Sequence, residues 1–495
     1  MALRLPHRAT ARVRPYKSQN VFLKNYICST MNTRALSNEH LAALTSIVGE
    51  AHLSIKAADL DHHAKDQSFH EPHRPAVVIW PGSTEEVAAI LELANQALIP
   101  VTPWGAGTSL EGNPIPLCGG IVLNLNRMNQ ILEVRPADFQ ADVQPGILYK
   151  DMNRQLARHG LFFAPDPGAN ASLGGMIANN AAGTRTPKYG ATRDNVLRLE
   201  VVTASGEMIR TGSLSPKTAS GYDMVHLLVG SEGTLGIVTE ATLRLAPLPE
   251  KFSAVIASFE SVEGAARAVS SIRGCGVTPA AMEFLDLTAV RALNTAAEIV
   301  FPECPLLLME FHGASEAGLQ EELVLVQELC RLEGCVAFQA GLGREERDRL
   351  WSVRHQAYEI FVRNNPERAF LIIDVAVAIS RFPQLVAAVE QILAERDLVG
   401  PLVGHAGDGN LHTLIPYTPG DPASQALALE ADAAMVEAAL VLGGTATGEH
   451  GVGLGKRRFM AQEHGGSLAL MQAIKRALDP NGILNPGKIF DQPVS

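Results

Sequence analysis

Trp104-Gly-Ala-Gly-Thr-Ser-Leu-Glu-Gly112 is the stretch that decides the fold. It places a glycine-rich loop directly after the run Val101–Pro103, which has the composition of a strand. Glycine removes the side chains that keep a ligand away from the backbone, so successive backbone N–H groups can face a phosphate. Thr108 and Ser109 add hydroxyl donors. The loop predicts an anion site at the end of a strand.

Two further glycine-rich stretches lie downstream. Pro165–Gly168 leads into Leu173–Gly183, and Gly230–Gly236 precedes an apolar run that starts at Ile237. One loop of this kind is usually only a turn. Three of them between residues 104 and 236 predict one long ligand that carries a diphosphate.

None of these loops is a standard nucleotide-binding motif. They lack the G-x-G-x-x-G spacing of a dinucleotide-binding βαβ unit. The stretch Gly448–Lys456 is no Walker A loop either, because His450 stands where a glycine is needed and Arg457 where Ser or Thr is needed. The ligand is therefore held by neither a Rossmann nor a P-loop site.

The order of predicted elements divides the chain into parts. From Ala76 to about Pro249, short strands alternate with helices. Residues 251–440 combine two long helical patterns, 262–273 and 317–332, with strands such as 255–259, which is typical of a second, α+β domain. In the first domain we expect helices from Ser37 and over 84–98, and strands over 77–80, 101–103, 196–203 and 237–245. The expected parts are a basic N-terminal extension (1–36), a ligand-binding domain (37–250), a second domain (251–445) and a C-terminal segment (446–495).

Composition narrows the function classes. The 495 residues are 46% hydrophobic and 19% charged, which is globular rather than disordered. A net charge of −11 argues against nucleic acid as the main partner. The six cysteines form no C-x-x-C pair, which excludes a disulfide scaffold and a Cys-built iron–sulfur site. No stretch of about 18 uninterrupted apolar residues predicts a membrane span.

A second group of polar residues lies in the last hundred residues. His405 and His412 flank the turn sequence Asp408-Gly-Asn410, which could bring both imidazoles together, and Glu449-His450 stands between glycines. Two imidazoles and a carboxylate could bind a divalent metal with open positions. The alternative is that each histidine satisfies only a local hydrogen bond.

These motifs together resemble the vanillyl-alcohol oxidase / p-cresol methylhydroxylase superfamily of flavoproteins. The resemblance covers about residues 70–490 and includes the family's C-terminal FAD-linked oxidase domain, through Gly404–His412, Gly448–Gly451 and Asn485–Lys488. It implies an α+β protein: a two-subdomain, non-Rossmann FAD-binding domain (PCMH-type) plus an α+β cap domain.

The resemblance also implies which residues contact FAD. They are Trp104, Gly105, Ala106, Gly107, Thr108, Ser109, Gly112, Pro167, Gly168, Gly174, Gly175, Asn179, Ala182, Gly183, Tyr189, Glu232, Gly233, Ile237 and Asn485. Some members tether FAD to a histidine in the first glycine loop. Residues 104–112 contain neither His nor Cys, so we expect non-covalent FAD.

The resemblance further implies the chemistry. His405, His412 and Glu449 match a divalent-metal site, for Zn²⁺ or Mn²⁺, and His450 matches the catalytic base. Arg354 matches the residue that binds the substrate carboxylate, and Tyr358, one helical turn on, is expected to line the substrate pocket. The implied activity is a flavin-dependent dehydrogenase that oxidises a small D-2-hydroxy acid, D-lactate first, to the 2-oxo acid.

Alternatives remain open at the sequence level. A glycolate oxidase flavin subunit and a D-2-hydroxyglutarate dehydrogenase share the motifs. The pocket shows no obvious cation for a second carboxylate, which favours a monocarboxylate. Close relatives carry a proline where this chain has Ala378, which leaves the pocket shape open. From other classes, a non-catalytic flavin electron-relay subunit and an alkyl-glycerone-phosphate synthase-type transferase are possible.

The sequence also leads to expectations about the electron acceptor and the cellular location. Reduced FAD must pass electrons to cytochrome c, a quinone, an electron-transferring flavoprotein or a partner subunit. Residues 1–36 hold seven basic residues and no acid, as in a mitochondrial transit peptide, although a solvated extension or a start at Met31 fits equally. We expect a cytoplasmic protein, or one peripheral to an inner membrane, and a mitochondrial one if the source is eukaryotic.

Overall fold

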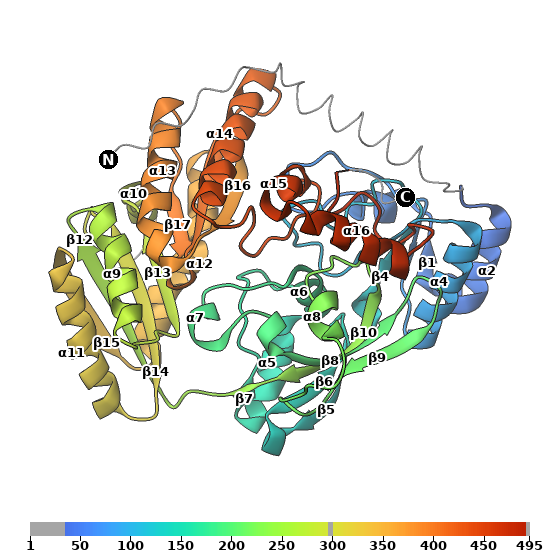
Figure 1. The fold of residues 1–495 in the computed structure, drawn as a ribbon, viewed down its shortest axis with the longest axis horizontal. Helices are drawn as coiled ribbons and strands as arrows, with labels where there is room; N and C mark the ends of the chain where they lie inside the picture. Colours follow the sequence, from blue (N-terminus) through green and yellow to red (C-terminus); the bar gives the residue numbers. More distant parts are fainter. Residues whose placement is uncertain (1–34, 296–299, 492–495) are drawn as a thin grey trace.

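The computed structural model describes residues 35–295 and 300–491, without the side chains of residues 346, 350 and 352–357. The blue and green half of the chain forms one body, the yellow and orange part forms a second beside it, and the red C-terminal segment returns to the first body (Figure 1).

A four-stranded sheet of order β1-β2-β4-β3 opens the first body. The strands are β1 (Leu53–Ser54), β2 (Val77–Ile79), β3 (Val101–Trp104) and β4 (Ile121–Asn124), and the helices of this subdomain are α2 (Asn38–Val48), α3 (Ala57–His62) and α4 (Thr84–Ala97). β2, β4 and β3 run parallel. The Ser83 side chain accepts a hydrogen bond from the Glu86 N–H and so begins α4, whose first turn also carries acids that the helix dipole favours.

An antiparallel sheet of order β5-β6-β10-β8-β9 forms the second subdomain. Its strands are β5 (Ile131–Arg135), β6 (Gln140–Val143), β8 (Val196–Val202), β9 (Met208–Gly212) and β10 (Ile237–Arg244); β7 (Leu161–Phe162) pairs with β11 (Ala246–Pro247). The helices are α5 (Tyr149–Leu156), α6 (Leu173–Asn179), α7 (Thr186–Tyr189) and α8 (Met224–Leu228). Buried residues of α5, α6 and α8 share one core with β6, β8 and β10.

The second body is built on a seven-stranded antiparallel sheet of order β15-β12-β14-β13-β17-β18-β16. The strands are β12 (Lys251–Phe259), β13 (Ala281–Leu285), β14 (Leu306–Gly313), β15 (Cys335–Leu342), β16 (Ala369–Ala376), β17 (Leu402–His405) and β18 (Asn410–Tyr417). The helices are α9 (Val262–Gly274), α10 (Leu287–Asn294), α11 (Glu316–Leu332), α12 (Arg344–Asn364), α13 (Phe382–Glu395) and α14 (Pro422–Val441).

Alternation along β12 shows that both faces of this sheet are covered. Val255, Ala257 and Phe259 belong to the large core formed with α9, α11, α13 and α14, whereas Ala254 and Ile256 belong to a smaller core with α10 and α12. Successive side chains of a strand point to opposite faces, so this split follows from the pleat.

The C-terminal segment closes the fold. After α15 (Met460–His464) and α16 (Ser467–Leu478), Leu484 forms a parallel bridge with Val101 of β3. The buried Lys475 ammonium donates to the carbonyls of Thr234 and Leu484 and pairs with Asp479. The end of the chain therefore completes the first body.

The predicted elements agree with the structure apart from one point. The expected strand 255–259 is the second half of β12, which starts at Lys251 because residues 251–258 pair with β14. None of the helices that the structure describes has the length and the apolar composition needed to cross a bilayer.

Candidate active site

A large cavity lies where the three glycine-rich loops meet. Its empty volume, including the open solvent at its mouth, is about 1290 Å³. Of the residues predicted to contact FAD, those that line it are Trp104, Gly105, Ala106, Gly107, Thr108, Ser109, Pro167, Gly174, Gly175, Asn179, Glu232, Gly233, Ile237 and Asn485.

The loop after β3 has the geometry of an anion cradle. Among the described residues, nothing accepts a hydrogen bond from the backbone N–H groups of Ala106–Ser109. Gly107 has φ +70°, and a Cβ there would lie 2.7 Å from the Trp104 ring. A Cβ on Gly105 would lie 2.0 Å from the Ser172 Oγ. Four free N–H groups in a loop that excludes side chains suit a diphosphate.

Five predicted FAD contacts do not line the cavity: Gly112, Gly168, Ala182, Gly183 and Tyr189. Gly183 lets its backbone pack directly against that of Asp166, because a Cβ there would lie 1.7 Å from the Asp166 carbonyl oxygen. The Tyr189 hydroxyl lies 2.7 Å from Nδ1 of His312, on β14 of the second body.

Sequence reasoning missed other lining residues, including Asn113, Pro145, Ser172 and Ser231. Ser172 had a visible signal, since a serine before Leu173-Gly-Gly is a good helix N-cap, and it does cap α6. Pro145 had none, because it reaches the cavity only through tertiary packing against Gly174.

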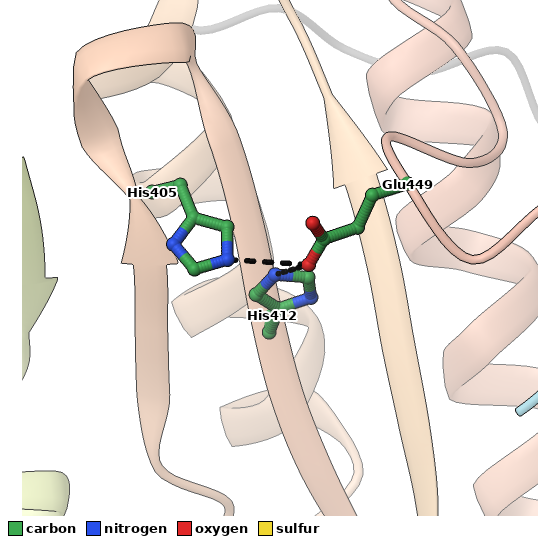
Figure 2. Close-up of side chains that lie close together, drawn as sticks. All are labelled: His405, His412 and Glu449. Carbon is green, nitrogen blue, oxygen red and sulfur yellow. Dashed lines mark hydrogen bonds and ion pairs between the residues drawn. The ribbon is translucent and has the colours of Figure 1, made fainter. Parts of the chain in front are cut away.

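The second site is a cluster of His405, His412 and Glu449 (Figure 2). One ligand atom from each residue lies within 4.8 Å of the others. His405 ends β17 and His412 lies in β18, so the tight turn between these strands brings the imidazoles together. The Nε2 atoms of both histidines lie 3.2 Å from Oε1 of Glu449.

A turn glycine makes this geometry possible. Gly409 has φ +75°, and a Cβ there would lie 2.0 Å from the Val377 carbonyl oxygen. Only glycine combines that conformation with so close an approach. The turn chemistry of Asp408-Gly-Asn410 therefore does what the sequence predicted.

Buried carboxylates orient the cluster. Glu283 of β13 lies 2.6 Å from Nδ1 of His405, which leaves Nε2 of that ring facing Glu449. Asp374 of β16 lies 3.7 Å from Nδ1 of His412. Carboxylates behind imidazoles are the usual support of metal-binding histidines. The sequence signal for Asp374 was a lone acid in the apolar run Phe370–Ile379; Glu283 gave none.

The charged groups of the cluster shift one another's pKa values. Burial acts to lower the pKa of His405, but Glu283 and Glu449 outweigh it and hold that pKa well above its ordinary value. Burial acts to raise the pKa of Glu449, but the two histidines hold it well below its ordinary value. Together these shifts keep a carboxylate charge at the centre of the cluster.

His450 lies between the cluster and the cavity. Its ring stacks on that of His412, with centroids 5.3 Å apart, and it lines the cavity together with Glu449. Its Nε2 lies 4.0 Å from Oε1 of Glu449. Burial lowers the pKa of His450, with Asp374 opposing in part, so the imidazole is neutral at pH 7. A neutral, buried imidazole beside the cavity can accept a proton.

The donor set fits a divalent cation. Two imidazoles and a carboxylate with room for further ligands is a common set for Zn²⁺ and is suited to Mn²⁺. Oε2 of Glu449 is buried without a hydrogen-bond partner among the described residues. A buried carboxylate oxygen with no partner is costly unless something binds it.

The predicted substrate residues lie on α12. The side chain of Arg354 lies outside the described part of the chain, so its role stays a prediction. Tyr358 is 49% exposed and does not line the cavity.

The comparisons with known proteins agree with this geometry. The model of the FAD binding domain matches residues 75–212, and that of the FAD linked oxidases, C-terminal domain, matches residues 248–489. The chain is 38% identical over 455 residues to a probable mitochondrial D-lactate dehydrogenase of Danio rerio, which covers 91% of each chain. It is 38% identical over 421 residues to the glycolate oxidase subunit GlcD of Bacillus subtilis (strain 168), which covers 84% of this chain and 89% of that one.

A solved structure shares the fold at low identity. A p-cresol methylhydroxylase with substrate bound superposes with a TM-score of 0.72 at 18% identity and covers 92% of this chain and 97% of its own. Such an identity shows the fold alone. The predicted fold class, an FAD-binding domain with two subdomains and an α+β cap, is confirmed. The chain belongs to the family of FAD-linked oxidases, with an FAD binding domain followed by the C-terminal domain of that family.

Proposed function

We propose that this protein is an FAD-dependent dehydrogenase that oxidises a small D-2-hydroxy acid, D-lactate first, to the 2-oxo acid. The observation that carries the proposal is the placing of His450 between the His405/His412/Glu449 cluster and the FAD cavity. The relatives named for D-lactate and glycolate oxidation, which match most of the chain, support the substrate class.

The residues divide the work as follows. Bound FAD supplies the hydride acceptor, and a bound divalent cation supplies positive charge for the substrate oxygen. His405, His412 and Glu449 hold that cation, and Arg354 binds the substrate carboxylate. His450 accepts the hydroxyl proton at Nε2, the ring nitrogen on the Glu449 side. Proton removal by a positioned base contributes roughly 10²–10⁴-fold.

FAD is held without a covalent bond in this proposal. The cradle 104–112 contains no side chain that could form the tether, and its free N–H groups hold the diphosphate. Of the predicted contacts, we retain as direct FAD ligands those that line the cavity, except Glu232, whose two carboxylate oxygens accept hydrogen bonds from Val452 and Gly453. Gly112, Gly168, Ala182, Gly183 and Tyr189 do not line the cavity, and their contact with FAD stays a prediction.

The substrate is a monocarboxylate in this proposal. Two buried lysines of the C-terminal segment are occupied: Lys456 Nζ lies 2.5 Å from Asp432, and Lys488 Nζ donates to the Ile115 carbonyl at 2.6 Å. Neither lysine is free to bind a second substrate carboxylate, as D-2-hydroxyglutarate would require. Glycolate, which lacks the methyl group of lactate, is the second candidate.

An external acceptor reoxidises the flavin. Cytochrome c is our first candidate, and a quinone, an electron-transferring flavoprotein or a partner subunit are the others. A mitochondrial location is supported for a eukaryotic source by the fish relative and by the basic residues 1–36. In a bacterium we expect a cytoplasmic protein or one peripheral to the inner membrane.

An anaerobic titration tests the function. Purified yellow protein is mixed without oxygen with D-lactate, L-lactate, glycolate and D-2-hydroxyglutarate. We expect D-lactate to bleach the flavin absorbance fastest and L-lactate to leave it unchanged. A non-catalytic electron-relay subunit or a transferase would keep its flavin oxidised with all four acids.

A further inference from the structure

The segment Gly448–Gly453, which carries Glu449 and His450, is held by one carboxylate from each body. We call it the His450 loop. Asp374, in the sheet of the second body, accepts hydrogen bonds from the backbone N–H groups of Glu449 and His450, both at 2.9 Å. Glu232, in the third glycine loop of the first body, accepts from the N–H groups of Val452 (2.6 Å) and Gly453 (2.9 Å). Four of the six backbone N–H groups of the loop therefore point to two buried anions.

Each carboxylate is itself fixed in place. Asp374 is fully buried and also accepts from the Thr447 hydroxyl (2.7 Å) and the Asn410 amide (2.7 Å). Glu232 is 3% exposed and has φ +53°, a strained conformation for a residue with a side chain. Its own carbonyl accepts from Asn485 at 2.7 Å. Strain retained at a buried position marks a site where the surroundings impose the conformation.

The loop backbone is shaped to receive these anions. Gly451 and Gly453 have φ of +82° and +48°, and a Cβ on Gly451 would lie 3.0 Å from the Glu232 carboxylate. Alternating left-handed glycines turn successive N–H groups toward one point, which is the geometry of an anion-binding nest. The Asn179 amide also donates to the His450 carbonyl at 3.2 Å, again from the first body.

We propose that Glu232 is a positioning residue that ties His450 to the FAD-binding body, while Asp374 ties Glu449 and His450 to the sheet that carries the histidine ligands. This inference rests on the proposed function in one respect, the role of His450 as base. The division of work is specific: loss of Asp374 disturbs the metal ligand, whereas loss of Glu232 moves the base relative to the flavin and leaves the metal ligands in place.

Hydrogen exchange of the as-purified protein tests the contacts without any assay of activity. The variants are Glu232→Gln, Asp374→Asn and the control Asp142→Asn. Asp142 is a buried carboxylate of β6 that pairs with Arg135 of β5 and does not line the cavity. We expect Glu232→Gln to speed exchange about tenfold in peptides that start at Gly451, and Asp374→Asn to do so in peptides that end at His450. The control should change neither. Equal exchange in all variants would refute the two clamps.

Kinetics test the consequence for His450. A misplacement of about 1 Å costs up to ~10²-fold in rate, so we expect Glu232→Gln to slow flavin reduction at saturating D-lactate by about 10-fold or more. FAD content, zinc or manganese content and substrate affinity should stay within twofold. Asp374→Asn should lose metal as well as rate. If Glu232→Gln loses FAD but its FAD-bound fraction is reduced at the normal rate, Glu232 is a flavin ligand and the proposal is wrong.

A second variant covers misfolding. If Glu232→Gln does not fold, Glu232→Asp keeps the charge but is shorter by one methylene, and the same pattern of exchange and rate is expected. A wild-type flavin that no 2-hydroxy acid reduces would overturn the proposed function, whereas the exchange pattern would still decide whether the clamps exist.

Discussion

Asp374 shows how one buried side chain can arrange several catalytic groups. It interrupts an apolar strand, and its two oxygens receive backbone N–H groups, a hydroxyl and an amide while facing His412 and His450. Burial acts to raise its pKa, but the two imidazoles outweigh burial and hold that pKa well below its ordinary value. The charge is therefore retained at any pH at which the protein works.

The role of His450 gives the first prediction. His450→Ala removes the group assigned to accept the hydroxyl proton, so the rate of flavin reduction at saturating D-lactate should fall ~10²-fold or more. Rapid anaerobic mixing measures that rate and the substrate affinity separately. His464→Ala, on α15, is the matched control and should reduce at the normal rate. Near-normal reduction by His450→Ala would remove it as the base.

Arg354 gives the second prediction. Arg354→Lys keeps a positive charge but loses the bidentate fork that matches a carboxylate. Substrate affinity and the reduction rate should both fall, because the carboxylate is held before and during hydride transfer. The same mixing experiment measures both quantities. Unchanged affinity would place the carboxylate clamp on another residue.

The metal ligands act as a unit and give the third prediction. Treatment with a chelator, followed by gel filtration, should abolish turnover while the flavin absorbance stays with the protein, since the cradle 104–112 and the cluster share no residue. Added Zn²⁺ or Mn²⁺ should restore activity. A thoroughly demetallated protein that still turns over normally would show that the cluster has only a structural role.

At the scale of single elements, the loop after β3 depends on contact with the N-cap of α6. Gly105→Ala would place a Cβ 2.0 Å from the Ser172 Oγ, between two parts of the cavity wall. Overpacking of this kind costs ~1–3 kcal/mol. We expect the apoprotein to relieve the clash by moving the loop, so that the same cost opposes FAD binding and lowers the affinity roughly 5- to 150-fold. Fluorescence titration of the apoprotein measures it. Gly274→Ala, where nothing lies within 4 Å of the added Cβ, should bind FAD normally.

The sequence predicted those parts of the site that depend on local patterns. Ser37 and Ser83 mark the starts of α2 and α4 because an N-cap side chain accepts a hydrogen bond from a backbone N–H only three residues farther on. The turn Asp408-Gly-Asn410 likewise predicted that His405 and His412 meet. Glu449 and His450, which lie more than thirty residues farther on, were noticed because glycines flank them, and the resemblance then implied their roles as metal ligand and base.

Contacts between distant segments could not be read from the sequence. Glu283 reaches His405 only because β13 and β17 are neighbours in the sheet, and that order follows from packing of the whole domain. Glu232 was expected to contact FAD, yet both its carboxylate oxygens accept from the His450 loop. Nothing in the sequence indicated that Tyr189 contacts His312 or that Gly183 allows a close approach to Asp166. The resemblance assigned both residues to FAD, which stays a prediction.

At the scale of the whole molecule, a buried lysine of the C-terminal segment makes the stability of the fold depend on pH. Lys488 is buried, and burial lowers its pKa to about 7, with Arg457 adding repulsion. The unfolded chain binds this proton up to about pH 10. Between pH 7 and pH 10 the unfolded state therefore binds more protons than the folded state, and stability should rise with pH.

This gives the fifth prediction. Chemical denaturation of wild type at pH 7, 8 and 9 should show a free energy of unfolding that increases with pH, and Lys488→Met should show a flatter profile over the same window. Lys251→Met, at a half-exposed lysine that pairs with Glu316, should keep the wild-type slope. If Lys488→Met keeps that slope too, Lys488 is charged in the folded protein.

The bridge between Val101 and Leu484 also sets the order of events during synthesis. The cradle is translated early, but Asn485, which lines the same cavity, and the loop that carries His450 belong to the last fifty residues. At ~5–20 residues per second a ribosome needs roughly 12–50 s for residues 251–495. During that time the first body lacks Asn485 and His450, which line its cavity. The FAD cavity is therefore complete only after Asn485 has been synthesised and Leu484 has paired with Val101.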